Sequence, residues 1–308
     1  MHIILDIVTV IFSIFALWWG ALWLVESASA IAEKLGISEI IIGLTIVAFG
    51  TSAPEFAVTT LAAIREQADI SVGNIVGSNI FNLGFILGGV AIISAVNTSK
   101  RLVYRDGLIL FLSSLILLFF LSDLALSRFE GVTLFIMLIA YLIYLSIKKE
   151  PIDEDVPSAE FHWFSIPKLA IGLVAIIGGG YFLVEASSSV ARAAGLSEWV
   201  IGVTIVAAGT SAPEFATSLA AVLKGKHGIS AGNLVGSNIF NTLGVLGLAA
   251  FIHPMSVDHD AFISIVTLTG LVVIVLIFMR IGWRVSRTEG IFLVLINLIV
   301  YFFNIFKF

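Results

Sequence analysis

The 308-residue chain has no cysteine and few charged residues. Without cysteine it can form neither disulfides nor thiolate metal sites, and it has no cysteine nucleophile. Charged residues make up 12% of the chain and hydrophobic residues 59%, whereas a soluble domain has about 25% charged residues. This scarcity of charge indicates that lipid, rather than water, surrounds much of the protein.

Apolar stretches of roughly 20 residues recur along the whole length, and each can cross a bilayer core of about 30 Å as a helix. The alternating segments of about 10 residues that form transmembrane barrels are absent. The first stretch runs from His2 past Leu24 without a preceding basic segment, so we interpret it as a retained helix and not as a signal peptide. We therefore predict an all-α integral membrane protein with ten transmembrane helices, near residues 3–28, 39–63, 72–96, 103–122, 130–147, 167–190, 198–222, 231–251, 260–279 and 290–306.

The longest polar connection between these predicted helices covers residues 148–166. It is short for a folded domain, so we predict a cytoplasmic linker between two five-helix repeats, residues 1–147 and 167–308. Lysine and arginine predict the orientation, because they gather on the cytoplasmic side of membrane proteins. With the N-terminus outside, twelve of the sixteen lie inside and four lie outside, namely Arg65, Arg128, Arg192 and Lys307.

The chain contains an internal repeat. A shift of 159 residues aligns residues 36–82 with 195–241 without a gap, and 29 of these 47 positions are identical. Each predicted half has an odd number of helices, so the second half must enter the membrane in the opposite sense. Inverted repeats of this kind place a transport site near the bilayer midplane, on interrupted helices where the repeats meet.

Both copies contain the segment Gly-Thr-Ser-Ala-Pro-Glu-Phe, at residues 50–56 and 209–215. Proline lacks an N–H group and clashes with the carbonyl four residues earlier, so we expect each helix to break or kink there. The break should leave carbonyls near residues 48–50 and 207–209 without helical partners, among them those of Ala48 and Ala207. Such carbonyls can coordinate a cation when they line a cavity.

A glutamate follows the proline in each copy, Glu55 and Glu214. An ionised carboxylate near the bilayer centre costs at least roughly 2.5–3.5 kcal/mol, which indicates that both glutamates are functional. Both glutamates have the same flanking residues, which argues against a packing role for both.

A second shared segment, Gly-Asn-x-x-Gly-Ser-Asn-x-x-Asn, occupies residues 73–82 and 232–241. Its glycines form small-xxx-small patterns, which let helices approach closely (Gly73, Gly77, Gly232 and Gly236). Each copy also places a serine and an asparagine four residues apart on one helix face. We predict that these side chains face the site: Ser78, Asn82, Ser237 and Asn241.

Together the two segments offer only oxygen ligands, because carboxylates, serine and threonine hydroxyls and amide oxygens are joined by loose carbonyls. The hydroxyls of the first segment belong to Thr51, Ser52, Thr210 and Ser211. Hard cations such as Ca²⁺ take about six to eight oxygens, whereas transition metals prefer nitrogen or sulfur. The five histidines lie at ends or in loops, away from these segments. The ligand set therefore favours Ca²⁺ or a few monovalent ions over zinc or copper.

At these residues the chain resembles the cation/calcium exchanger superfamily, in particular the prokaryotic sodium/calcium exchangers. The resemblance covers essentially the whole chain, and its two alpha motifs fall at residues 43–84 and 202–244. It implies antiport of Na⁺ against Ca²⁺, typically three for one, through overlapping sites that the ions occupy alternately. The implied ligands are Ala48, Thr51, Ser52, Glu55, Ser78, Asn82, Ala207, Thr210, Ser211, Glu214, Ser237 and Asn241.

Two departures bear on the choice of ion. Several relatives, among them potassium-dependent ones, carry an acid where this chain has Asn241, so the neutral Asn82 and Asn241 argue against potassium coupling. Calcium/proton exchangers of the superfamily have a glutamate where this chain has Gly77 and Gly236, which argues against proton coupling.

We therefore predict a transporter and not an enzyme, acting by alternating access in a prokaryotic plasma membrane. The first and sixth helices, near 3–28 and 167–190, could slide as a gate against the other eight. Ca²⁺, Na⁺ and lipid are the expected partners. No cofactor or nucleic acid is expected, and a monomer is compatible with the plan.

Several alternatives stay open. Glu55 and Glu214 could carry protons in a Ca²⁺/H⁺ antiporter, another divalent cation could be the cargo, and a channel is a further option. An intramembrane protease would need paired aspartates, a Ser/His arrangement or a His/Glu zinc motif within the membrane, and these are absent. Three aspartates lie near predicted helix ends, where we interpret them as interfacial charges: Asp6, Asp106 and Asp123.

Overall fold

A computed structural model describes residues 2–148, 160–195, 205 and 207–306. The chain is an all-helical membrane protein whose described strands are four two-residue segments. The helices are α1 (His2–Leu35), α2 (Glu39–Ile42), α3 (Ala48–Thr51), α4 (Ala53–Ile64), α5 (Ala68–Phe81), α6 (Leu87–Ile93), α7 (Gly107–Phe120), α8 (Arg128–Ile147), α9 (Ser165–Ala193), α11 (Ala207–Thr210), α12 (Ala212–Leu223), α13 (His227–Ile239), α14 (Leu246–Ile252), α15 (His259–Arg280) and α16 (Arg287–Phe306).

Short irregular turns interrupt or extend several of these helices. Four complete π-helical turns lie within the described residues, η1 (Gly43–Val47), η2 (Asn82–Ile86), η3 (Leu102–Asp106) and η6 (Phe240–Val245). One 3₁₀ turn, η4 (Leu121–Asp123), follows α7. Because a π turn carries one extra residue, it changes the direction in which the following side chains point.

Within the described residues, seven continuous helices are long and apolar enough to cross a membrane. A bent pair, residues 39–51 and 53–64, would be an eighth span. Helices lie over nine of the ten predicted ranges, and of the range 198–222 the residues 198–204 and 206 fall outside the described part. Most of the predicted linker, residues 149–159, also falls outside it.

The distribution of side chains is that of a protein in lipid. Large apolar side chains are exposed along the outer faces of the helices, for example Phe12, Phe119 and Val174. Polar side chains, by contrast, are buried in the centre of the bundle. A soluble monomer rarely exposes apolar surface on this scale.

The structural repeat extends further than the sequence repeat. The bounds of α4 and α12, of α6 and α14, and of α8 and α16 each differ by 159 residues at both ends. Sequence identity fades after residues 82 and 241, yet the two halves keep the same gap-free register up to residues 147 and 306.

Two small antiparallel pairs join the halves. Strand β1 (Val96–Asn97) pairs with β4 (Arg284–Val285), and β2 (Ala125–Leu126) pairs with β3 (Met255–Ser256). A shift of 159 residues converts one pair into the other, since β1 corresponds to β3 and β2 to β4. Each pair therefore connects the third helix region of one half to the loop before the last helix of the other.

A further motif, Ser-Arg-x-Glu-Gly, begins the last helix of each half at residues 127–131 and 286–290. In each copy the serine and glutamate form a reciprocal capping box, which satisfies free N–H groups of the first turn. The glycine lets the helix cross closely over the other half: a Cβ on Gly131 would lie 2.7 Å from the Gly247 oxygen, and one on Gly290 would lie 2.6 Å from the Gly88 oxygen. The two halves are thus interlocked.

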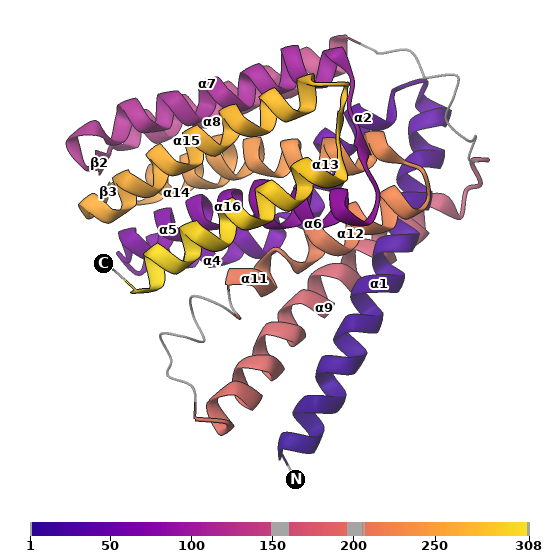
Figure 1. Cartoon of the computed structure of the whole chain (residues 1–308), viewed down its shortest axis with the longest axis horizontal. Helices are drawn as coiled ribbons and strands as arrows, with labels where there is room; N and C mark the ends of the chain where they lie inside the picture. Colours follow the sequence, from indigo (N-terminus) through magenta and orange to yellow (C-terminus); the bar gives the residue numbers. More distant parts are fainter. Residues whose placement is uncertain (1, 149–159, 196–204, 206, 307–308) are drawn as a thin grey trace.

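Helices α1 and α9 lie side by side and extend beyond the rest of the bundle (Figure 1). They are antiparallel, because the Ser189 hydroxyl donates to Asp6 at 2.7 Å near one end and Lys168 donates to Glu26 at 2.9 Å near the other. A basic residue of the remaining helices also reaches this pair near Glu26. Lys224, which follows α12, lies 3.5 Å from Glu26 of α1.

A second polar contact joins α1 to the core more deeply. The Ser29 hydroxyl on α1 donates to Glu39 Oε1 at 2.6 Å, and Lys226 Nζ lies 2.9 Å from the same oxygen. The Glu39 and Lys226 side chains are only 11% and 10% exposed, so this ion pair is screened much less than a surface pair.

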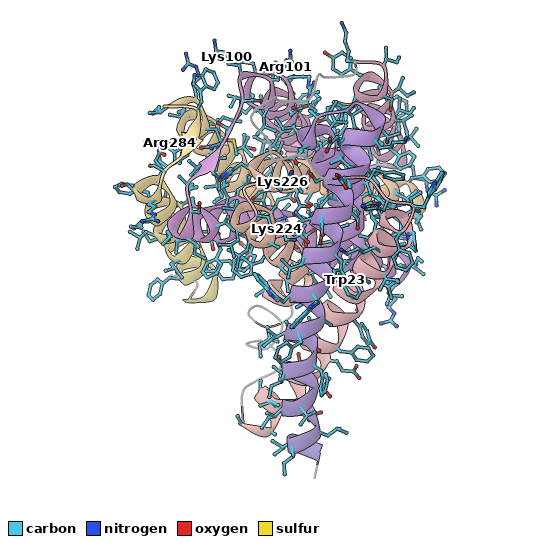
Figure 2. All side chains as sticks on the ribbon, turned by 90° about the vertical axis from the view of Figure 1, so that its right-hand side faces the viewer. Trp23, Lys100, Arg101, Lys224, Lys226 and Arg284 are labelled. Carbon is cyan, nitrogen blue, oxygen red and sulfur yellow. The ribbon has the colours of Figure 1, made fainter. Side chains whose placement is uncertain are left out.

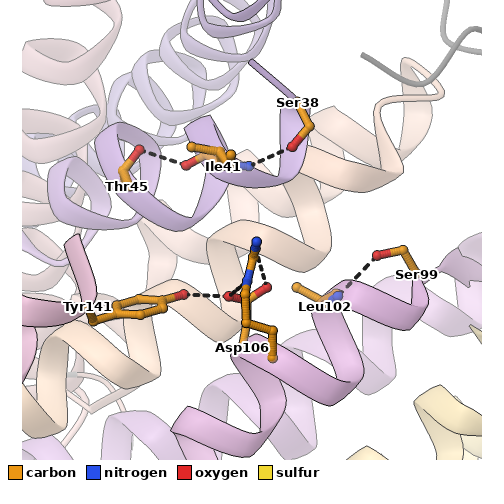
Figure 3. A network of polar contacts seen from close by, with 8 residues as sticks. Ser38, Ile41, Thr45, Ser99, Leu102, Asp106 and Tyr141 are labelled. Atoms are coloured by element: carbon orange, nitrogen blue, oxygen red, sulfur yellow. Dashed lines mark hydrogen bonds and ion pairs between the residues drawn. The ribbon is translucent and has the colours of Figure 1, made fainter. Parts of the chain in front are cut away.

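One sequence interpretation is wrong. Asp106, which we expected to be an interfacial charge, is completely buried. Its carboxylate pairs with Arg105 at 2.8 Å and accepts a hydrogen bond from the Tyr141 hydroxyl at 2.8 Å (Figure 3). The π turn η3 ends at this residue and directs the side chain into the bundle, which the apolar pattern did not reveal.

Candidate functional site

The site is built on two helices that break at the predicted positions. The first consists of α3 and α4, which meet at Ser52 and form part of a pair of segments bent by 50°. The second consists of α11 and α12, which meet at Ser211. In each case proline is the second residue of the new helix, a position that needs no backbone N–H. The predicted effect of Pro54 and Pro213 on the helices is confirmed.

The Ala48 carbonyl keeps its hydrogen bonds at the break. The Ala48 carbonyl accepts the Ser52 N–H at 3.1 Å and the Thr51 hydroxyl at 3.3 Å, so the expectation that it lacks a helical partner is wrong. The reason is that α3 completes its last turn before Ser52 leaves the helical conformation. Ala207 is the first residue of the equivalent helix α11.

Glu55 and Glu214 lie in the first turns of α4 and α12 and are completely buried. Each accepts a hydrogen bond from a serine of the other half: Ser211 donates to Glu55 Oε1 at 3.1 Å, and Ser52 donates to Glu214 Oε1 at 3.1 Å. The positive end of each helix dipole stabilises a carboxylate at this place. The two broken helices therefore meet through their glutamates.

The second carboxylate oxygens are arranged differently. Glu55 Oε2 and Glu214 Oε2 are buried and have no hydrogen-bond partner among the described residues. No ion pair in the described part of the chain connects either glutamate to a basic side chain. Two negative charges without a counter-charge are costly inside a membrane protein, and a bound cation would remove that cost.

The predicted hydroxyls surround these carboxylates. The Thr51 hydroxyl lies 3.4 Å from the Ser237 hydroxyl, which brings together the two halves. Ser78, Thr51 and Ser237 are all buried. Thr210 is also buried beside Ser211.

The two predicted amides lie in π turns. Asn82 is the first residue of η2 and Asn241 the second residue of η6, and both are completely buried. Neither amide atom of Asn82 has a partner among the described side chains and backbone. Asn241 donates its amide N–H to Asn79 at 3.1 Å, whereas its oxygen has no described partner.

Sequence reasoning missed two hydroxyls, those of Thr59 and Ser218, through which asparagines of the second segment hold the broken helices. Asn74 donates to the Thr59 hydroxyl at 2.9 Å, and Asn233 donates to the Ser218 hydroxyl at 3.0 Å. Thr51 in turn donates to Asn233 Oδ1 at 3.0 Å. Thr59 and Ser218 occupy equivalent positions in the repeat, and this recurrence of a hydroxyl at the same register could have identified them.

The glycines of the second segment pack as predicted in one half. A Cβ on Gly232 would lie 2.7 Å from the Ile40 oxygen, and one on Gly236 would lie 2.8 Å from the Leu44 oxygen. Gly73 and Gly77 have no such neighbour in the described residues. The segment equivalent to η1 in the second half, residues 202–206, lies almost entirely outside the described part, so the packing of these two glycines stays a prediction.

The arrangement can bind a hard cation. Glutamate, serine and threonine oxygens from both halves lie together at one buried place, and oxygen ligands of this kind suit hard cations. A helical bundle in lipid with such a site at the meeting point of two repeats defines a membrane cation transporter.

The chain belongs to the sodium/calcium exchanger protein family, whose sequence profile matches it twice, over residues 5–147 and 164–306. The family is one of membrane transporters. CaxA of Alkalimonas amylolytica is 36% identical over 291 residues, which cover 90% of this chain and 91% of CaxA. The sodium/calcium exchanger MaX1 of Methanosarcina acetivorans is 32% identical over 320 residues, covering 90% of this chain and 91% of MaX1.

The fold is similar to that of a solved exchanger. A structure of the sodium-calcium exchanger NCX_Mj soaked with Na⁺ and Sr²⁺ has a TM-score of 0.86 and 31% sequence identity, over 96% of this chain and 98% of that protein. The double match of the family profile also agrees with the internal repeat.

Proposed function

We propose that the protein is a sodium/calcium antiporter that exchanges Na⁺, three ions in each cycle, for one Ca²⁺ by alternating access. The observation that carries this proposal is the pair of buried glutamates, Glu55 and Glu214, each hydrogen-bonded by the other half and each with one oxygen without a described partner. The similarity to MaX1 and NCX_Mj supports Na⁺ and Ca²⁺ as the ions.

The site's charge explains why transport of the two ions would be coupled. One Ca²⁺ or a few Na⁺ ions neutralise the carboxylates, so an occupied site can pass the apolar barrier at lower cost than an empty one. The two ions share oxygen ligands and cannot bind as full sets together. With three Na⁺ for one Ca²⁺, each cycle moves one net charge, and a potential of about 100 mV contributes about 2.3 kcal/mol.

Twelve residues are proposed to hold the ions. They are the carbonyls of Ala48 and Ala207 and the side chains of Thr51, Ser52, Glu55, Ser78, Asn82, Thr210, Ser211, Glu214, Ser237 and Asn241. All belong to one chain, so a monomer contains the whole site. For Ala48 the ion would take the place of the Thr51 hydroxyl, which donates to the carbonyl at 3.3 Å, because the Ser52 N–H uses the other of its two lone pairs.

The proposed topology has ten spans in two inverted halves, residues 1–147 and 167–308, joined by 148–166. The antiparallel contact of α1 with its counterpart α9 supports the inversion. Figure 2 labels five basic residues assigned to the cytoplasmic side, and they lie away from the free end of α1, which supports an orientation with the N-terminus outside: Lys100, Arg101, Lys224, Lys226 and Arg284.

Helices α1 and α9 are proposed as the moving gate. Helix α9 packs directly against both breaks, because a Cβ on Gly50 would lie 2.2 Å from Leu173 Cδ2, and one on Gly209 would lie 2.3 Å from Val184 Cγ2. A shift of the gate would therefore uncover or cover the glutamates just beyond these glycines.

Cross-links can separate movement of the gate from movement within it. The chain has no native cysteine, so Ser29→Cys with Glu39→Cys can be joined by a short thiosulfonate reagent to fix α1 to the core. We expect this cross-link to reduce Na⁺-dependent Ca²⁺ uptake to background and reduction to restore it. Asp6→Cys with Ser189→Cys joins α1 to α9 at a similar distance and is the matched control that should keep transport. Unchanged uptake with α1 fixed to the core would rule out the sliding gate.

The proposed coupling is tested by ⁴⁵Ca²⁺ uptake into proteoliposomes. An outward Na⁺ gradient should drive uptake, and a pH gradient alone should not, because both amide positions are neutral and the site has only two carboxylates. If each cycle moves net charge, an inside-negative potential and an inside-positive potential should change the rate of uptake in opposite directions. Uptake driven by the pH gradient and indifferent to Na⁺ would establish the Ca²⁺/H⁺ alternative instead.

A further inference from the structure

The two site amides, Asn82 and Asn241, are equivalent in the repeat but differ in their surroundings. Asn241 donates its N–H to Asn79 Oδ1 at 3.1 Å, so its amide nitrogen is engaged and its oxygen is left for another partner. Asn82 makes no hydrogen bond to a described residue through either amide atom. One amide is therefore held in a single orientation, while the other can turn.

Asn79 is itself held by the second half of the chain. Its amide nitrogen donates to the Thr242 hydroxyl at 2.9 Å and to the Asn238 carbonyl at 3.3 Å. These two acceptors fix the Asn79 nitrogen on one side, and its oxygen must then face Asn241. All of these side chains are at most 1% exposed, so water does not compete for the bonds.

The equivalent bonds are missing in the first half because one residue differs. The position equivalent to Thr242 is Leu83, which has no acceptor. The residue equivalent to Asn79 is Asn238, and its amide nitrogen donates instead to the Leu234 carbonyl of its own helix at 2.7 Å. Its oxygen has no described partner. Asn238 therefore does not orient Asn82.

We propose that Thr242 and Asn79 are positioning residues that hold the Asn241 amide oxygen toward the ion, so that Asn241 is a preorganised ligand and Asn82 an adaptable one. This rests on the proposed function, since it assigns unequal roles to two of the proposed ligands. An amide turned by half a rotation presents its NH₂ group to a cation, which repels it. Fixing the oxygen in advance removes that competing orientation and the entropy lost on binding.

The unequal roles have a consequence for ion preference. Ca²⁺ needs many oxygens at once, at about 2.3–2.6 Å, so its binding depends on the preorganised side of the site. The same site is proposed to hold Na⁺ ions at another stage of the cycle. Exchanging Ca²⁺ for Na⁺ needs one ligand that can reorient, and Asn82 can do so. We call the hydrogen bonds that run from Thr242 through Asn79 to Asn241 the relay. Loss of the relay should therefore weaken Ca²⁺ binding more than Na⁺ binding.

The test uses Thr242→Val, which keeps the side-chain shape and removes the acceptor. Equilibrium binding of ⁴⁵Ca²⁺ to the purified full-length protein in Na⁺-free buffer should weaken by roughly three- to tenfold, the effect of one hydrogen bond. Thr242→Ser should restore wild-type affinity because it restores the hydroxyl. Thr267→Val on α15 is the matched control, since its hydroxyl bonds only its own helix at an exposed position.

Each outcome is decisive. Wild-type Ca²⁺ affinity in Thr242→Val, or equal weakening in Thr242→Ser, would overturn the relay, as would an equal loss of Na⁺ and Ca²⁺ binding. The proposed function fails separately, if the wild type binds Ca²⁺ but does not exchange it for Na⁺ in proteoliposomes. A wild type that binds no Ca²⁺ would overturn both.

Discussion

Replacing Glu55 or Glu214 with glutamine is expected to abolish Na⁺-gradient-driven Ca²⁺ uptake in proteoliposomes. The substitution keeps the size of the side chain and the oxygen that accepts the serine hydrogen bond, but it removes the charge that attracts the cation. Loss of residues that merely support a metal ligand costs about 10–100-fold in affinity or activity, so loss of a charged ligand should cost at least roughly a hundredfold.

Two comparisons make this result specific. Glu185→Gln changes the same residue type at an exposed position on α9 and should leave uptake near the wild-type rate. Elution of the glutamine variants as a single peak in detergent, at the wild-type volume, would show that they are folded. Retained uptake in either folded variant would contradict the assignment of the ion site.

The second large effect is expected for Gly236→Ala. An added Cβ would lie 2.8 Å from the Leu44 Cα, the Leu44 oxygen and the Ala48 Cβ, and backbone atoms cannot move aside as a flexible side chain can. Overpacking of this kind costs about 1–3 kcal/mol. Because α13 must move away from α3, the 3.4 Å approach of Ser237 to Thr51 should also be lost, and Ca²⁺ affinity should fall with stability.

Thermal unfolding followed by tryptophan fluorescence, together with Ca²⁺ binding, measures both effects. Gly270→Ala is the matched control, because a Cβ at this place on α15 meets no described atom within 4 Å. It should leave the midpoint unchanged or raise it, since alanine favours helix over glycine. Equal midpoints for the two alanine variants would show that the contact between α13 and η1 does not need glycine.

The parts of this structure that were predictable from sequence are those that a membrane makes costly. Apolar runs had to be helices, because lipid cannot hydrogen-bond an open backbone. Pro54 and Pro213 had to interrupt helices, and Glu55 and Glu214 had to be functional to be tolerated there. The bend at Ser52 and the meeting of the two glutamates through serines of opposite halves agree with that reasoning.

The parts that were not predictable depend on small local changes in helix geometry. The π turns η2 and η6 set the directions of Asn82 and Asn241, and an extra residue in a helical turn leaves little trace in an apolar pattern. The same holds for η3, which places Asp106 inside the bundle. The Ala48 carbonyl keeps its hydrogen bonds because the break lies a few residues further along, within the uncertainty of a boundary.

The interlocking of the halves was also hidden. Identity fades after residues 82 and 241, and only short matches, such as the Ser-Arg-x-Glu-Gly motif at 127–131 and 286–290, show in the sequence that the repeat continues. Its importance lies in contacts between distant segments, such as Gly131 with Gly247, and a single sequence contains no measure of those distances.

The most direct test of the account is competition between the two ions at equilibrium. Purified protein should bind one ⁴⁵Ca²⁺ per chain, Na⁺ should displace it with a sigmoidal dependence on concentration, and K⁺ should not. Glu55→Gln or Glu214→Gln should remove this binding. Ca²⁺ that stays bound while Na⁺ saturates the same protein would contradict a single site, shared by both ions, between the two halves.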